Sequence, residues 1–164
     1  MSLGAQVLLE ILAQRKDICR YALVESAAVI PSGLTNALIG PSVASSYNLI
    51  KNRKFASLQF RSLHMKDELF EDYYRDTCAI SKADMIAFLK ANTSYALKDS
   101  VCDNLAEIHV FAGQKETREI LKSAELIQEK LPTCQVRILP GLYHGEFSIN
   151  HAEDYVKALR SILL

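Results

Sequence analysis

The last third of the chain alternates between short apolar segments and helical patterns. Segments 108–112 and 136–139 are apolar enough for strands that are buried on both faces, and 117–130 and about 152–164 have the apolar spacing of helices. Asn150 and Glu153 suit the capped start of the last helix. Parallel strands need crossover connections, which this strand-helix-strand-helix order supplies. The pattern therefore predicts an α/β fold.

Each of the two strands ends in a glycine-containing loop that carries a side chain able to handle protons. Loop 113–116 ends on Glu116, and loop 140–145 contains His144. Imidazole titrates near neutral pH, and a carboxylate can hold its tautomer and stabilise its cation. The two residues are the types that form the acid and base of a catalytic triad.

The remainder of the chain divides into two parts of different character. The pattern predicts a helix over 3–14 and a buried strand over 21–24, whereas 31–95 has a helical pattern without a strand. Pro31-Ser32-Gly33 and Gly40-Pro41-Ser42 are expected to interrupt that pattern. Its clearest helix is expected to start at Ser81, with Asp84 favouring the first turn. We expect a core formed by 1–30 and 97–164 and a helical insertion over 31–96.

Composition excludes several classes of function. The 164 residues contain 19 lysines and arginines and 19 aspartates and glutamates, and basic residues do not cluster with aromatics, which disfavours nucleic-acid binding. No apolar run reaches the ~20 residues of a membrane span and no signal peptide is recognisable, so we expect a cytoplasmic protein without membrane contact. The four cysteines are widely spaced and the histidines lack metal-ligand spacing. No metal and no cofactor are expected.

Segment Met1-Ser2-Leu3-Gly4-Ala5 opens an amphipathic helix and looks like the second half of a Gly-x-Ser-x-Gly turn. With the order Ser2, Glu116, His144, nearly the whole chain resembles the C-terminal half of the α/β-hydrolase superfamily, from the nucleophile elbow onward. The resemblance implies a partial three-layer α/β-hydrolase fold whose parallel strands are equivalent to the last three of the sheet. It also implies that 31–96 is an inserted helical cap.

The resemblance implies a role for each matching residue. Ser2 becomes the nucleophile, the Leu3 amide an oxyanion-hole donor, Glu116 the acid and His144 the base. The chain departs from the family pattern in having no glycine ahead of the serine and glutamate instead of the more usual aspartate. Glu25, at the end of the strand over 21–24, is an alternative acid, and Glu116 would also favour a helix N-terminus. A Met-Ser-Leu start is also typical of an expression leader.

These implications predict a serine hydrolase that acts on a small ester, thioester or related acyl compound. The alternative is a non-catalytic, truncated hydrolase fragment that serves as an oligomeric or partner-binding module. The strand over 21–24 would leave an apolar sheet edge bare, which predicts a homodimer or association with a missing N-terminal half. For the 164-residue chain alone we expect little or no activity, because half of the oxyanion hole and the elbow strand would be absent.

Overall fold

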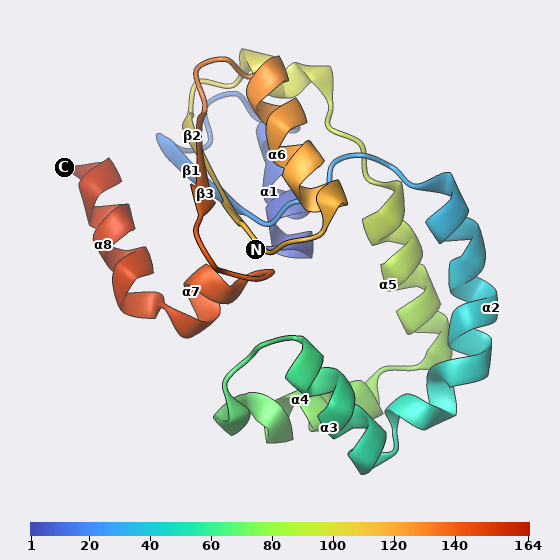
Figure 1. Cartoon of the computed structure of the whole chain (residues 1–164). Helices are drawn as coiled ribbons and strands as arrows, with labels where there is room; N and C mark the ends of the chain where they lie inside the picture. The colour runs from blue at the N-terminus through green and yellow to red at the C-terminus, as the bar shows by residue number, and fades with distance from the viewer. The chain divides into compact units, whose positions relative to one another are not determined.

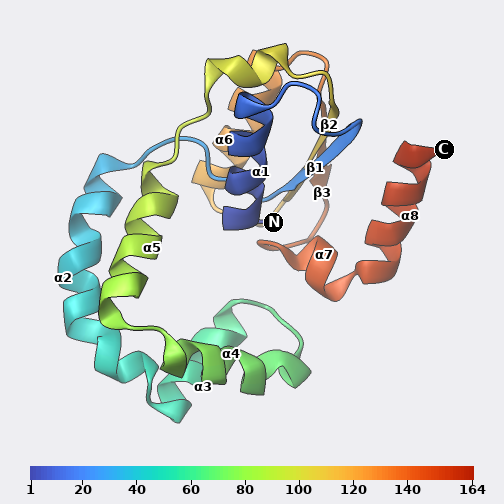
Figure 2. The same cartoon turned by 180° about the vertical axis from the view of Figure 1, so that it is seen from behind.

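The computed structural model describes all residues from Met1 to Leu164 (Figures 1 and 2). The chain forms two compact units. The first contains Met1–Pro31 and Tyr95–Leu164, and the second contains Ser32–Ser94. Each unit is described by itself.

The first unit is built on a parallel sheet with the strand order β1-β2-β3. Val24 of β1 lies opposite Val110 of β2, and Ala112 of β2 lies opposite Ile138 of β3. In chain order the elements of this unit are α1 (Leu3–Gln14), β1 (Tyr21–Glu25), η2 (Asp99–Asp103), β2 (Glu107–Gly113), α6 (Arg118–Lys130), β3 (Gln135–Leu139), α7 (Glu146–Asn150) and α8 (Ala152–Leu163). The strands expected at 21–24, 108–112 and 136–139 are confirmed, each with one or two added residues.

The sheet is covered on both faces because successive strand side chains point to opposite sides. Val110 and its neighbours on one face join the buried residues of α1 and α6, including Leu9 and Ile127. Phe111 on the other face packs against Phe147 of α7 and Ile162 of α8. Figures 1 and 2 show α1 and α6 on one side of the strands and α8 on the other. The unit is therefore a three-layer α/β structure.

β1 is an edge strand, with β2 on one side only. At its carboxyl end, the Ser2 amide donates a hydrogen bond of 2.9 Å to the Glu25 carbonyl on the outer side. Backbone groups alternate between the two sides of a strand, so those of Tyr21 and Leu23 also face this outer side. An apolar edge of this kind is able to pair with a further strand.

The second unit is entirely helical. It contains α2 (Gly33–Ile50), α3 (Arg53–Ser62), η1 (Asp67–Leu69), α4 (Phe70–Ala79) and α5 (Lys82–Ser94). The Asn36 amide ties α2 to α5 by donating to the Lys90 carbonyl and to the Thr93 and Ser94 hydroxyls. Phe60 is buried and contacts the rings of Phe70 and Tyr73.

Two local expectations were wrong and one is confirmed. Pro41 does not interrupt the chain but lies inside α2, because the preceding residue is Gly40, which lacks the Cβ that normally clashes with a proline ring. Asn150 does not cap α8: it ends α7 and donates to the Glu146 carboxylate, and α8 begins after His151. The Ser81 hydroxyl does cap α5, accepting the Asp84 amide at 3.1 Å.

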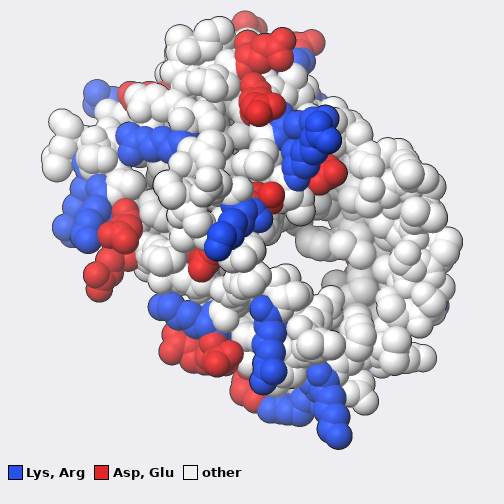
Figure 3. All heavy atoms as spheres, viewed as in Figure 1, with Lys and Arg blue, Asp and Glu red and all other residues white.

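Acidic and basic side chains are interspersed on the visible face of the molecule, and the surface over α2 is uncharged (Figure 3). The charges in α3 and α4 are largely paired: Arg53 contacts Glu71, and Arg75 contacts Asp72 and Asp76. None of the helices is both long and apolar enough to cross a membrane.

Candidate active site

Glu116 is the buried centre of a hydrogen-bond network at the carboxyl end of β2. Its side chain is 0% exposed, and its Oε2 lies 2.7 Å from Nδ1 of His144. Its Oε1 accepts the Ser26 hydroxyl at 2.6 Å and the Gly113 amide at 3.1 Å. Both carboxylate oxygens are therefore held by groups from three different segments of the chain.

The pKa of Glu116 reflects a competition between burial and these donors. Burial by itself raises the pKa of a carboxyl group, because it disfavours the charged form. Here the hydrogen bonds from His144, Ser26 and the Gly113 amide outweigh it and lower the pKa of Glu116 below its ordinary value of 4.5. Glu116 is therefore an anion at neutral pH, able to orient the His144 ring and stabilise its cation.

The loop that carries Glu116 and the loop that carries His144 are joined along their backbones. The Gln114 amide donates to the Leu139 carbonyl and the Lys115 amide to the Leu142 carbonyl, both at 2.9 Å. A Cβ atom on Gly113 would lie 2.3 Å from the Leu142 carbonyl oxygen, so only glycine permits this approach. The short distance between Glu116 and His144 follows from this pairing of loops.

The turn around His144 is fixed from both sides. The Tyr143 amide donates to the Glu146 carboxylate at 2.8 Å, and the Gly145 amide donates to the Ser26 hydroxyl at 3.1 Å. Gly145 adopts a φ of 66°, a left-handed conformation that favours glycine. The His144 side chain remains 45% exposed. Its Nδ1 faces Glu116, which leaves Nε2 to exchange a proton with another group.

Ser2 lies at the start of α1 in an uncommon backbone conformation, with φ 51° and ψ −122°. Such a conformation is strained for a residue with a side chain and is often found at functional sites. The Ser2 carbonyl accepts the amides of Ala5 and Gln6, while its own amide is bound to Glu25. Leu3 is the first residue of α1, so its N–H has no acceptor within the helix. A serine hydroxyl and a helix N-terminal amide therefore lie side by side.

Contacts of the flanking residues bring the Ser2 turn and the His144 loop together. The side chain of Met1 lies against Gly145: a Cβ atom on this glycine would be 2.7 Å from the Met1 sulfur. Figures 1 and 2 both show the N-terminus beside the segment between β3 and α7. The residue before Ser2 therefore contacts the residue after His144, and the contact between His144 and Glu116 lies at the carboxyl end of β2. Open α/β sheets commonly bind ligands at this end of their strands.

Glu25, considered from the sequence as an alternative acid, has a different set of contacts. Its side chain is buried, and Oε1 accepts the Ser148 amide of α7 at 3.2 Å. It thus holds the helix that follows His144, while Glu116 is hydrogen-bonded to the imidazole itself. Sequence reasoning overlooked Ser26, which bonds to both loops. The available signal was its position directly after an apolar strand that ends in a carboxylate.

The other histidines and the cysteines show no metal-binding arrangement. His109 is buried in the sheet, with Nε2 3.0 Å from the Glu107 carboxylate, and no group of three potential ligands could hold an ion. The four cysteines form no disulfide. Cys102, in η2, is exposed and donates to the Lys130 carbonyl.

The second unit contains an apolar pocket of its own. It has a volume of about 710 Å³ and is lined on α2, α4 and α5 by apolar side chains, with Asp72 and Asp76 among its few polar neighbours. The apolar lining includes Val43, Ile50, Tyr73, Met85, Phe88 and Leu89. Its size lies within the range of small-molecule sites.

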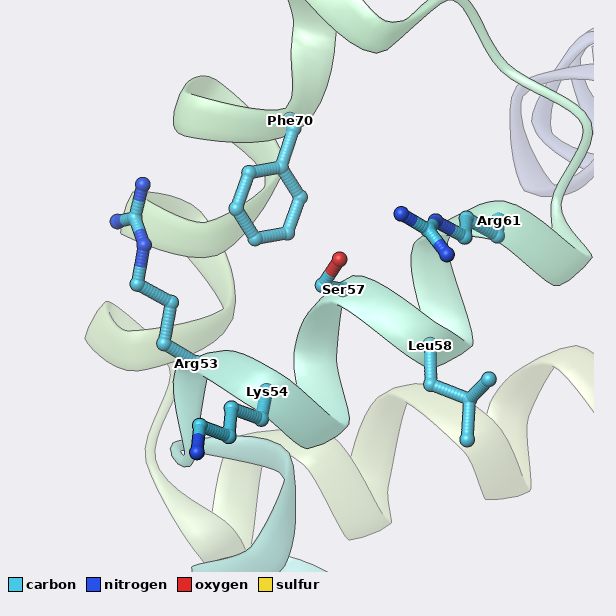
Figure 4. A pocket seen from close by; sticks show the side chains of 6 residues that line it. All are labelled: Arg53, Lys54, Ser57, Leu58, Arg61 and Phe70. Carbon is cyan, nitrogen blue, oxygen red and sulfur yellow. The ribbon is translucent and has the colours of Figure 1, made fainter.

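A second hollow, of about 600 Å³, lies on α3 (Figure 4). Its lining residues are Arg53, Lys54, Ser57, Leu58, Arg61 and Phe70. Arg53 is already engaged, because its guanidinium pairs with Glu71 and lies 5.2 Å from the centre of the Phe70 ring. The positive charge of this hollow is therefore partly neutralised within the unit.

Solved structures define the class of fold. The chain matches a carboxylesterase from the ammonia-oxidizing thaumarchaeon Nitrososphaera gargenis with a TM-score of 0.71 and 13% identity, over 99% of this chain and 62% of the esterase. It matches a bromoperoxidase from Bacillus anthracis with a TM-score of 0.72 and 14% identity, over 98% and 63%. An α/β hydrolase from a Medee basin deep-sea metagenome library matches with a TM-score of 0.69 and 11% identity, over 95% and 60%.

No family model and no curated protein sequence matches this chain. The structural matches nevertheless show an α/β-hydrolase fold, which confirms the fold class predicted from the sequence. The chain spans about three fifths of the length of the structures it matches. Its three parallel strands, with helices on both faces, form a partial α/β-hydrolase fold.

Proposed function

We propose that the chain carries the catalytic residues of a serine hydrolase that cleaves small esters or thioesters. The observation that carries this proposal is the 2.7 Å contact between the buried Glu116 carboxylate and His144. The strained turn of Ser2 at the start of α1 adds the nucleophile. The fold is compatible with this chemistry but does not by itself specify it.

In the proposed reaction His144 acts first as a base and then as an acid. Its Nε2 takes the proton of the Ser2 hydroxyl while Oγ bonds to the acyl carbon of the substrate. The carbonyl electrons move to oxygen, where the Leu3 amide is one donor to the developing charge. The alcohol or thiol leaves with the proton from His144. Water then repeats the sequence on the acyl-serine, releasing the carboxylic acid and restoring Ser2.

We further propose that the outer edge of β1 pairs with an added strand, supplied by a second copy of this chain in a purified sample. The hydrogen bond from Ser2 to Glu25 already occupies the end of that edge. The outward-facing backbone N–H and C=O groups of Tyr21 and Leu23 are available to form further hydrogen bonds with an added strand.

Hydrolysis of p-nitrophenyl acetate and butyrate by the purified chain tests the proposed function. We expect at most slow turnover by the chain alone, because the Leu3 amide supplies only half of an oxyanion hole, and this turnover should disappear with Ser2→Ala and with His144→Ala. Ser161→Ala is the matched control, because this serine is exposed on α8 and bonds only to its own helix. Turnover that survives both Ser2→Ala and His144→Ala would show that these residues are not the catalytic ones.

A further inference from the structure

We propose that Ser26 is a positioning residue that sets the geometry of Glu116 and His144 together. This inference rests on the proposed function and names a residue outside the triad. The Ser26 hydroxyl donates to Glu116 Oε1 at 2.6 Å and accepts the Gly145 amide at 3.1 Å. A single hydroxyl thus joins the acid to the loop that carries the base.

The backbone of Ser26 is held in a conformation that serves this contact. Ser26 has a φ of 56°, in the left-handed region that residues with a side chain rarely adopt. Its amide is anchored to the Phe111 carbonyl at 2.9 Å, and its side chain is buried. Strain of this type persists only where the surroundings fix it. Here the surroundings are β2 on one side and the two site loops on the other.

The hydroxyl also completes the environment of the carboxylate. Glu116 Oε1 has two donors, the Gly113 amide and the Ser26 hydroxyl, and Oε2 faces the imidazole. Without the hydroxyl, Oε1 keeps only the amide, and the Gly145 amide loses its acceptor. A buried group that loses its partner is destabilised. Both loops are therefore expected to relax at the same time, and the orientation of His144 changes with them.

Ser123 provides a matched control for burial and hydrogen bonding. Ser26 and Ser123 are each 1% exposed. The Ser123 hydroxyl likewise makes two bonds, accepting the Val29 amide at 3.0 Å and donating to the Glu119 carbonyl at 2.8 Å. None of these partners belongs to the site. Replacing Ser123 with alanine removes a buried hydroxyl without touching Glu116 or His144.

The inference predicts different outcomes for the two alanine variants. Ser26→Ala removes a donor that favours the charged form of Glu116, so the pKa of Glu116 rises toward its ordinary value. We expect kcat for the nitrophenyl ester to fall about tenfold, with KM within about twofold, as expected for lost transition-state positioning. Ser123→Ala leaves the pKa of Glu116 and kcat unchanged.

The test is a titration of the Glu116 side-chain carboxyl carbon by NMR in the full chain, with kcat and KM measured alongside. Ser26→Gly is made in parallel, because glycine also removes the hydroxyl but accepts the positive φ if the alanine variant does not fold. A raised midpoint in either Ser26 variant, absent in Ser123→Ala, supports the inference. An unchanged midpoint, or equal losses of kcat in Ser26→Ala and Ser123→Ala, overturns it. The titration shows whether Ser26 acts on Glu116 even if the parent chain hydrolyses no ester. Failure of the inference is therefore distinguishable from failure of the proposed function.

Discussion

Replacing Glu116 with glutamine should change the tautomer of His144 while leaving the fold in place. Glutamine has nearly the same shape as glutamate, so its amide oxygen can accept the Ser26 hydroxyl and the Gly113 amide as Oε1 does now. Its NH2 group then points at Nδ1 of His144. Because NH2 only donates, Nδ1 must become an acceptor and the ring proton must move to Nε2. That nitrogen can no longer take a proton from a serine.

The size of the effect follows from the contacts of the carboxylate. A hydrogen bond to a charged group contributes about 1.5–3 kcal/mol and one between neutral groups about 0.5–1.5 kcal/mol. The two bonds retained at Oε1 are therefore weakened by about 1 kcal/mol each, partly offset by the easier burial of a neutral side chain. We expect a loss of about 1–2 kcal/mol in stability. The wrong tautomer costs about four orders of magnitude in kcat if the proposed chemistry holds.

The assay combines urea unfolding with NMR of the chain labelled with ¹⁵N-histidine, which distinguishes the tautomers by the shifts of the two ring nitrogens. Glu119→Gln is the control, because Glu119 is an exposed acid in the first turn of α6, three residues from Glu116. It should leave the His144 spectrum unchanged. A ring proton that stays on Nδ1 in Glu116→Gln would refute the assigned contact between these two residues.

Three further outcomes are expected. Folding lowers the pKa of Glu116, so the stability that this carboxylate contributes is present above the ordinary pKa of 4.5 and is lost as pH falls through the lower folded pKa. In Glu116→Gln the free energy of unfolding should therefore fall less steeply with decreasing pH. Gly113→Ala should destabilise the chain in thermal unfolding, because the new Cβ would lie 2.3 Å from the Leu142 carbonyl oxygen. Gly4→Ala in α1, where the new Cβ meets open space, should instead raise the free energy of unfolding by about 0.5–1 kcal/mol. Light scattering should show a dimer through the β1 edge that is weakened by Leu23→Pro, which removes an outward-facing amide; a monodisperse monomer of the parent chain would contradict the proposed pairing.

The sequence was sufficient where local pattern and tertiary packing agree. β2 could be predicted because an uninterrupted apolar run suits a strand that is covered on both faces, and α1 because one stripe of apolar residues faces the sheet. Glu116 and His144 were recognisable because each follows a strand and has glycine close by. The short distance between the Glu116 and His144 side chains could not be predicted, because it depends on backbone hydrogen bonds between two loops far apart in sequence.

The sequence was insufficient where a residue acts through a distant partner. Ser26 is an unremarkable serine in the sequence, and its importance comes from contacts with Glu116, 90 positions away, and Gly145, 119 positions away. Pro41 was misjudged because the effect of the glycine before it was left out. Asn150 was misjudged because it ends the short helix α7 directly before α8 begins, and the Asn150 side chain donates to Glu146 in α7.

The most direct test of the proposed roles of Ser2, Glu116 and His144 is the reaction of the folded chain with a fluorophosphonate, followed by peptide mass spectrometry. We expect a single phosphonylated site, at Ser2, with the modification lost in His144→Ala and retained in Ser161→Ala. Modification of a different serine, or none in a sample shown to be folded by circular dichroism, would contradict the claim that Ser2, His144 and Glu116 act together as a nucleophile, base and acid.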